Sequence, residues 1–164
     1  MAIERATAAE RLKERIYATL TMLAVVIGLA ESTPPGTHSD AAWTIGGTAV
    51  GVWLATLVAD QQSHRVVHHR LARGEELRRM LYTSAPLLLS GVGPLLFTAL
   101  SALGAIRLRP ALFTAVVVDL AELFGWGVIS GVRMGGTAAA AVVAGLADVV
   151  VGAGIVAVKV WTTH

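Results

Sequence analysis

The chain has 164 residues, of which 55% are hydrophobic and 15% are charged. Soluble domains carry about 25% charged residues, so this composition excludes an ordinary soluble protein. The absence of cysteine excludes disulfides and zinc–thiolate sites. The formal net charge of +2 gives no indication of a nucleic-acid partner, and none is expected.

Apolar stretches of about 20 residues recur along the whole chain, which is the pattern of membrane-spanning segments. A lipid-facing backbone must satisfy its own hydrogen bonds, so these stretches are expected to be helices. The alternation typical of barrel strands is missing. The sequence therefore predicts an all-α integral membrane helix bundle forming a single domain, residues 1–164, with no cofactor. About five spans are expected, at 16–33, 41–60, 81–104, 110–131 and 137–158.

The chain begins with a charged segment, residues 2–15, which predicts a short cytoplasmic lead-in helix. The first apolar run is expected to be an uncleaved span that ends at Pro34-Pro35-Gly36. A small polar loop leads into the second span. The basic segment 61–80 follows, and Gly74 is expected to divide it into two helical pieces.

The basic residues are unevenly distributed between the loops. Ten of the 13 Lys and Arg residues lie in the N-terminal segment, in 61–80 and at Arg133, whereas Arg107, Arg109 and Lys159 lie in the opposite loops. The positive-inside rule then places the N-terminus in the cytoplasm and His164 outside. The expected location is the cell membrane, as a multi-pass protein of a bacterial inner membrane.

Three carboxylates interrupt the last two apolar runs. Asp119 and Glu122 lie midway along one run and Asp148 lies midway along the next. A charge at the bilayer centre costs about 2.5–3.5 kcal/mol on insertion scales, so such residues usually face an interior or a partner. Two neighbouring acids in a low dielectric favour protonation of at least one. One interpretation is a proton or cation path, and the other is that neutral acids hydrogen-bond between helices.

Other residues in the spans extend this hypothesis to a pathway. Trp126 follows Glu122 on the same helical face. Pro94 interrupts the third span, because its ring leaves the carbonyl of Ser90 without a helical donor. Broken helices line ion sites in many transporters, although prolines are also tolerated in ordinary spans. Ser90, Pro94 and Trp126 are therefore candidate pathway or gate residues.

A ladder of ionisable residues continues beyond the second span. Asp60, His64 and His68 are spaced by four, which places them one above another on a helix. This is the only constellation with metal-ligand character, and Asp60 with His64 is also a candidate cytoplasmic mouth. The alternative is a helix end with solvated histidines near an anionic lipid surface.

Small residues recur at helical spacing in two spans. Gly47-xxx-Gly51-xxx-Ala55 and Gly127-xxx-Gly131-xxx-Gly135 permit close approach of helices. They predict packing within a protomer or between protomers, and a homo-oligomer is expected.

Short motifs give the chain a resemblance to a family of small multi-pass membrane proteins of high-GC Gram-positive bacteria. The motifs are Glu14-Arg15-Ile16-Tyr17-Ala18-Thr19, Val52-Trp53-Leu54-Ala55 and Val158-Lys159-Val160-Trp161. Family members often carry a histidine after the Trp-Leu-Ala motif, where this chain has Thr56. The family has no established activity, so the resemblance implies a topology and no function.

The leading hypothesis is an oligomeric channel or transporter for a small cation, either a proton or a metal ion, that uses the midplane carboxylates. The alternative is a non-transporting membrane scaffold or regulator whose buried acids only lock helix packing. No nucleophile elbow, P-loop, dinucleotide fingerprint or HExxH motif occurs, so the protein is not expected to be an enzyme.

Overall fold

The computed structural model describes residues 2–32 and 37–162. Within these ranges the structure is entirely helical and contains no strand, which confirms the predicted all-α class. Pro34-Pro35-Gly36 and His164 lie outside the described residues. The helices are α1 (Ala2–Ala30), α2 (His38–His68), α3 (Glu75–Leu89), α4 (Val92–Ala102), α5 (Leu108–Arg133) and α6 (Ala138–Thr162).

Four segments are long and apolar enough to cross a membrane: α2, the α3–α4 pair, α5 and α6. The remaining helix, α1, is charged in its first half, and its apolar part covers only 16–30. This part rises about 22 Å at 1.5 Å per residue, which is less than the roughly 30 Å of a hydrocarbon core. Four full spans and one shorter apolar helix agree with the prediction of about five.

Two expected boundaries change in the structure. Residues 2–15 do not form a separate lead-in helix, because α1 continues without a break into the apolar segment. The basic segment is divided into two helical pieces as predicted, but the break covers residues 69–74 and not Gly74 alone. The left-handed backbone of His69 (φ 54°) ends α2, and Gly74 (φ 56°) precedes α3.

The third span is broken into α3 and α4. The break lies at Ser90 and Gly91, directly N-terminal to α4, in which Pro94 lies in the first turn. Pro94 has no N–H to donate to the Ser90 carbonyl, which explains the position of the break. Pro86, which was not among the residues predicted to matter, lies inside α3 and gives the segment a second proline two helical turns before Pro94.

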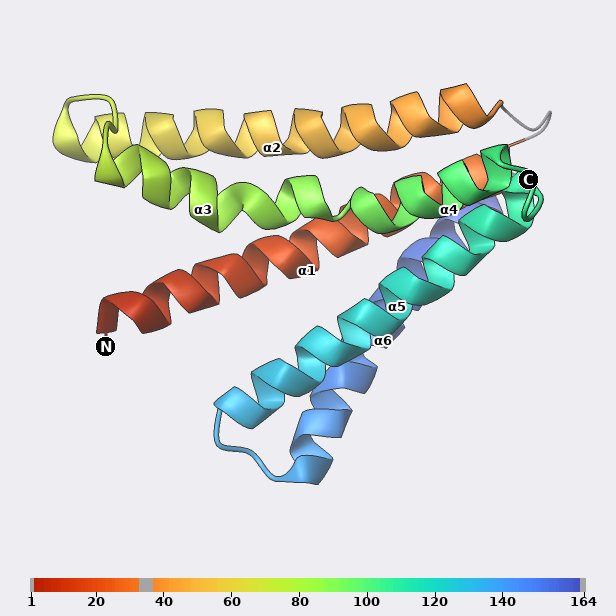
Figure 1. Ribbon diagram of the computed structural model, residues 1–164. Coiled ribbons are helices and arrows are strands. Elements are labelled where there is room, and N and C mark those ends of the chain that lie inside the picture. The colour runs from red at the N-terminus through yellow and green to blue at the C-terminus, as the bar shows by residue number, and fades with distance from the viewer. Residues whose placement is uncertain (1, 33–36, 163–164) are drawn as a thin grey trace.

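The helices gather at one end of the molecule and diverge at the other (Figure 1). The α1 helix contacts α2, α3, α5 and α6, and its Leu23, Val26 and Ile27 form the core with α2 and α5. The N-terminus, the α2–α3 turn and the α5–α6 turn lie at the diverging end, as the predicted alternation of loops requires. We refer to it as the cytoplasmic end, after the orientation predicted from the Lys and Arg distribution, and to the other as the outer end.

Polar contacts tie the outer end together. Arg109 Nε donates to the carbonyl of Ala30 at 3.1 Å, and its Nη2 lies 3.3 Å from Glu31 Oε1. His38 Nε2 and Ser101 Oγ, from α2 and α4, are 3.0 Å apart. The first contacts join α1 to α5, and the last joins α2 to α4. The helix ends are therefore held in two pairs at the outer end, whereas the helices diverge at the cytoplasmic end (Figure 1).

The α5–α6 hairpin is packed backbone against backbone. A Cβ placed on Gly127 would lie 2.5 Å from Gly145 Cα, and one on Gly131 would lie 2.5 Å from Ala141 Cα. The small-residue stripe of α5 therefore packs inside the protomer. The stripe of α2 differs, because Gly47 and Gly51 are exposed and have nothing within 4 Å.

Candidate functional site

A small cavity of about 120 Å³ brings together three of the residues proposed from sequence. Glu122 and Trp126 of α5 line it from one side, and Ser90 lines it from the break between α3 and α4. The remaining lining residues are Arg15, Thr19, Pro86 and Leu89. The broken span therefore presents its interruption to the midplane carboxylate of α5. We call this space the Glu122 cavity.

Arg15 also lines this cavity, although it is not among the residues predicted from the sequence. It is four residues beyond Arg11 on α1, and its guanidinium carbon lies 4.3 Å from the centroid of the Trp126 ring. Long basic side chains at the end of an apolar helix lay their stems along apolar surface, and this was the available signal. The apolar runs contain no cation at the depth of the acids, but folding brings this one to the Glu122 cavity.

Asp119 lies one helical turn from Glu122, in a different environment. Its side chain is 4% exposed, and its Oδ2 has no hydrogen-bond partner among the described residues. Leu123 and Val116, on the same face of α5, belong to the apolar core. Burial of an unpaired polar group costs free energy, so this carboxyl is costly to the fold. Glu122 is exposed to a cavity that contains a guanidinium, whereas Asp119 is enclosed by apolar side chains.

Asp148 and Asp119 lie at different depths in the bundle. Its Oδ2 would be 2.6 Å from a Cβ placed on Gly127. Because Gly127 faces Gly145 and Gly131 faces Ala141, Asp148 lies about level with position 124, which is five residues, or about 7.5 Å, along the axis from Asp119. The expectation that both acids share one depth is therefore not met, because the close contact of Gly127 with Gly145 sets the register of the hairpin. Asp148 is displaced toward the cytoplasmic end.

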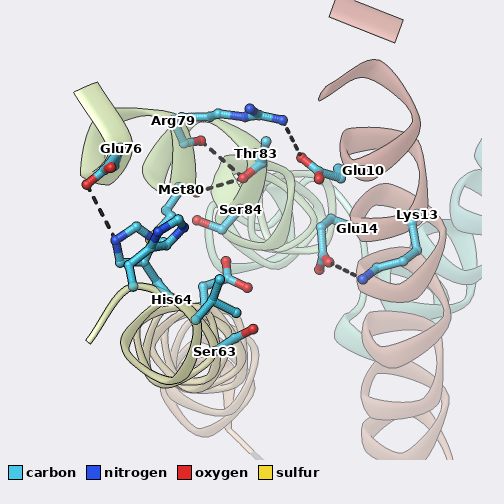
Figure 2. Close-up of a pocket in the computed structure, with 13 residues that line it drawn as sticks. Glu10, Lys13, Glu14, Ser63, His64, Glu76, Arg79, Met80, Thr83 and Ser84 are labelled. Carbon is cyan, nitrogen blue, oxygen red and sulfur yellow. Dashed lines mark hydrogen bonds and ion pairs between the residues drawn. The ribbon is translucent and has the colours of Figure 1, made fainter. Parts of the chain in front are cut away.

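The predicted Asp60, His64 and His68 ladder lines a different cavity, of about 510 Å³, between α1, α2 and α3 (Figure 2). The rings of His64 and His68 are tilted, with centroids 4.3 Å apart. Glu10 and Glu14 of α1 and Glu76 of α3 also line this space, which we call the acidic cavity. In the described part of the chain no group of three His, Asp or Glu side chains converges as a metal site, so the metal site stays a prediction.

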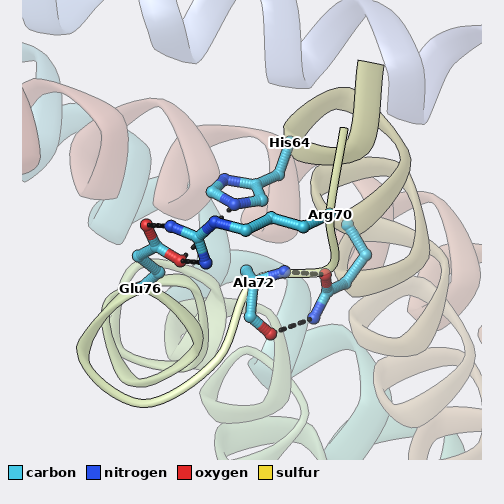
Figure 3. A network of polar contacts seen from close by, with 5 residues as sticks. His64, Arg70, Ala72 and Glu76 are labelled. Carbon is cyan, nitrogen blue, oxygen red and sulfur yellow. Dashed lines mark hydrogen bonds and ion pairs between the residues drawn. The ribbon is translucent and has the colours of Figure 1, made fainter. Parts of the chain in front are cut away.

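The rim of the acidic cavity is held by paired groups (Figure 3). Arg70 donates to both oxygens of Glu76, at 2.8 and 2.6 Å, and His64 Nε2 lies 3.4 Å from Glu76 Oε2. Gln61 accepts from the N–H of Ala72 at 3.0 Å and donates to its carbonyl at 3.3 Å. Glu76 is in the first turn of α3, before the apolar segment, and the hydrogen bonds from Arg70 lower the pKa of its carboxyl.

Ser90 and Pro94 have different surroundings. Ser90 Oγ donates to the carbonyl of Leu87 at 2.8 Å, and Ser90 lines both the Glu122 cavity and a small void beside Thr21 and Thr48. Pro94 is fully buried and is absent from the lining of the Glu122 cavity. The pathway role predicted for Pro94 is therefore indirect, through the helix break that it causes.

Comparison of the chain with models of known families, with curated proteins and with solved structures found no significant match. The family resemblance therefore stays a prediction.

Proposed function

We propose that the protein is a proton-exchanging membrane transporter or channel in which Asp119 and Glu122 bind the proton. The observation that carries the proposal is the enclosed Asp119 carboxyl, whose Oδ2 has no partner in the part of the chain that the structure describes, one turn from a second carboxylate that lines a cavity. Ionisable groups of this kind within a membrane are expensive, and they commonly mark proton or ion pathways. Two carboxyls in unequal environments differ in how readily they hold a proton, so one can pass a proton to the other.

The cytoplasmic approach to the Glu122 cavity supports a proton rather than a metal ion. An adjoining cleft of about 550 Å³ shares Arg15 and Trp126 with this cavity and is also lined by Arg11 and Arg133. Arginine stays protonated in proteins, and its fixed positive charge opposes a divalent metal ion about twice as strongly as it opposes a proton. A proton can instead move along water and hydroxyl groups to Glu122.

On the outer side of Asp119, apolar side chains of the core fill the bundle. Leu112, Ala115 and Val116 of α5 pack there against α1. In this conformation Asp119 is therefore nearer to a cytoplasmic route than to an outer one. Transport would require the outer end, where Arg109 contacts Glu31 and Ala30, to separate in a second conformation.

Proton flux into liposomes tests the proposal. Purified protein is reconstituted with an internal pH dye, and flux is driven by a potassium diffusion potential with valinomycin. Wild type is expected to acidify the lumen faster than protein-free vesicles. Asp119→Asn is expected to lower the protein-dependent rate at least tenfold, and Glu122→Gln several-fold. Asp148→Asn is the matched control and is expected to retain the rate within twofold.

Two results would overturn this function. One is a wild-type rate equal to that of empty vesicles, and the other is an unchanged rate in both Asp119→Asn and Glu122→Gln. Circular dichroism and size-exclusion profiles of each variant separate a lost site from a lost fold.

A membrane scaffold is the second candidate, and the α5–α6 contact is the observation that favours it. Asp148 lies against Gly127 in a hairpin joined by backbone contact, an arrangement typical of helix packing. If the acids only lock helices, wild type shows no flux, and Asp119→Asn raises thermal stability. A homo-oligomer stays a prediction, for which the exposed Gly47 and Gly51 stripe offers a face.

A further inference from the structure

We infer that the cleft between α1 and α5 binds the phosphate of an anionic phospholipid from the cytoplasmic leaflet. The cleft is bordered by Arg11 and Arg15 of α1, Tyr82 of α3, and Trp126 and Arg133 of α5. We call it the arginine cleft. The lipid site needs only these side chains and their position, although the proposed function uses the same cleft as the approach to Glu122.

Two guanidinium groups of the arginine cleft are held by aromatic rings. The guanidinium carbon of Arg11 lies 3.9 Å from the centroid of Tyr82, and that of Arg15 lies 4.3 Å from the centroid of Trp126. Stacking on an aromatic face orients a guanidinium and leaves the N–H groups at its edge available. These N–H groups suit a phosphate, which guanidinium binds with paired hydrogen bonds.

The arginines of the cleft also lack carboxylate partners. Among residues 7–32 and 37–162, no carboxylate lies within 4.0 Å of the guanidinium nitrogens of Arg11, Arg15 or Arg133, whereas Arg79 and Arg109 each contact one. Glu122 lines the adjoining cavity with Arg15 but forms no ion pair with it, so three positive charges lie against at most one nearby carboxylate and attract an anion. The missing partner is therefore expected to be a ligand.

The position of the cleft indicates a lipid as the source of the phosphate. Arg133 ends α5 at the cytoplasmic end, where α5 and α6 diverge from the other helices (Figure 1). Leu12 of α1 and the Trp126 ring supply apolar lining beside the arginines. Basic pockets between membrane helices on the cytoplasmic side bind anionic headgroups in this way. A volume of about 550 Å³ is sufficient for a headgroup.

Native mass spectrometry of the full chain in detergent, titrated with phosphatidylglycerol or phosphatidylcholine, tests the inference. Wild type is expected to retain one phosphatidylglycerol with at least tenfold preference over phosphatidylcholine. Arg11→Gln/Arg133→Gln is expected to lower this preference at least fivefold. The matched control is Arg65→Gln/Arg73→Gln, which removes two charges from exposed positions outside the cleft and is expected to keep it.

Arg133→Gln alone, at an exposed helix end, provides a variant with little risk to folding and is expected to give a smaller loss of preference. Equal retention of the two lipids by wild type would overturn the inference. An equal loss in the control pair would also overturn it, because binding would then follow total charge. If millimolar inorganic phosphate displaces all bound phosphatidylglycerol and itself protects the protein from heating, the ligand is a soluble phosphate and the assignment to lipid is wrong.

Discussion

Two helical hairpins flank α1, and they are built in opposite ways. The α5–α6 hairpin is joined by glycine contacts along its length. The α2–α3 hairpin is instead joined near its turn by contacts of Gln61 and Arg70, and the acidic cavity lies between these two helices and α1. At the rim of the acidic cavity Arg70 and Glu76 form a paired contact, and His64 Nε2 lies 3.4 Å from Glu76 Oε2 without a hydrogen bond. Asp119, in the tightly packed hairpin, has neither an ion pair nor a hydrogen bond at its Oδ2 among the described residues.

The two faces of α1 match this difference. Glu10 and Glu14 line the acidic cavity with α2 and α3, whereas Arg11 stacks on Tyr82 of α3 and Arg15 on Trp126 of α5 in the arginine cleft. One helix thus presents two acids to a cavity that also holds histidines, and two arginines to the cleft that leads to Glu122. A count of charges along the chain therefore says little about their chemistry. The chemistry of each charge depends on which side chains of the neighbouring helices surround it.

The largest effect is expected from filling the glycine contact of α5 and α6. In Gly127→Ala the new Cβ would lie 2.5 Å from Gly145 Cα and 2.9 Å from the carbonyl of Ala144, and neither backbone atom can move aside alone. Overpacking costs about 1–3 kcal/mol, and a backbone contact favours the upper part of that range. Thermal unfolding in detergent is expected at a clearly lower temperature. Gly125→Ala is the control, since nothing lies within 4 Å of that position; equal stability of the two variants would contradict the described hairpin.

A smaller effect is expected at the outer end, where Arg109 holds α1 to α5. Arg109→Gln removes contacts to Ala30 and Glu31 and leaves a Glu31 side chain that is only 10% exposed without its cation. Because the pair is partly exposed, a cost of about 1 kcal/mol is expected. Chemical denaturation measures it. Arg107→Gln, at an exposed position two residues earlier, is expected to have no effect, and a matching loss there would argue against a specific tie.

At the turn between α2 and α3, Gln61→Ala is expected to lower the free energy of unfolding by an amount comparable to or smaller than that of Arg109→Gln. The variant loses two part-buried hydrogen bonds to Ala72, and because water can replace them the two together are worth about 1 kcal/mol, the low end of the usual range per bond. Amide hydrogen exchange is expected to speed up at Ala72 and to change little in α5 and α6. The neighbouring Gln62→Ala, at an exposed position, provides the control. Unchanged exchange at Ala72 would show that the turn does not depend on Gln61.

The smallest effect is expected from pH at the Arg70–Glu76 pair. The hydrogen bonds from Arg70 lower the pKa of Glu76 in the folded state. Their contribution to stability is therefore present above the ordinary pKa of glutamate and is lost as pH falls through the lowered value. The difference in unfolding temperature between wild type and Glu76→Gln is expected to shrink between pH 6 and acid conditions, roughly pH 3. A difference that persists unchanged in acid would contradict a contribution from the charged carboxylate.

Much of the architecture could be predicted from the residues because each signal was local. Apolar run length gives the spans, the Lys and Arg distribution gives the relative orientation of the loops, and Pro94 gives the break after Ser90. The depth of Asp148 could not be predicted. It depends on the register of α5 against α6, which the contact between Gly127 and Gly145 sets across two different segments.

That the chain is helical, that it suits a bilayer and that three acids lie within its spans follows from composition and from spacing along single helices. The side chains that surround those acids follow only from the packing of one helix on another. This packing encloses Asp119 in apolar side chains, opens Glu122 to a cavity shared with Arg15, and sets Asp148 apart. The physical reason is that partners in a helix bundle come from other helices, so crossing angles and register determine them.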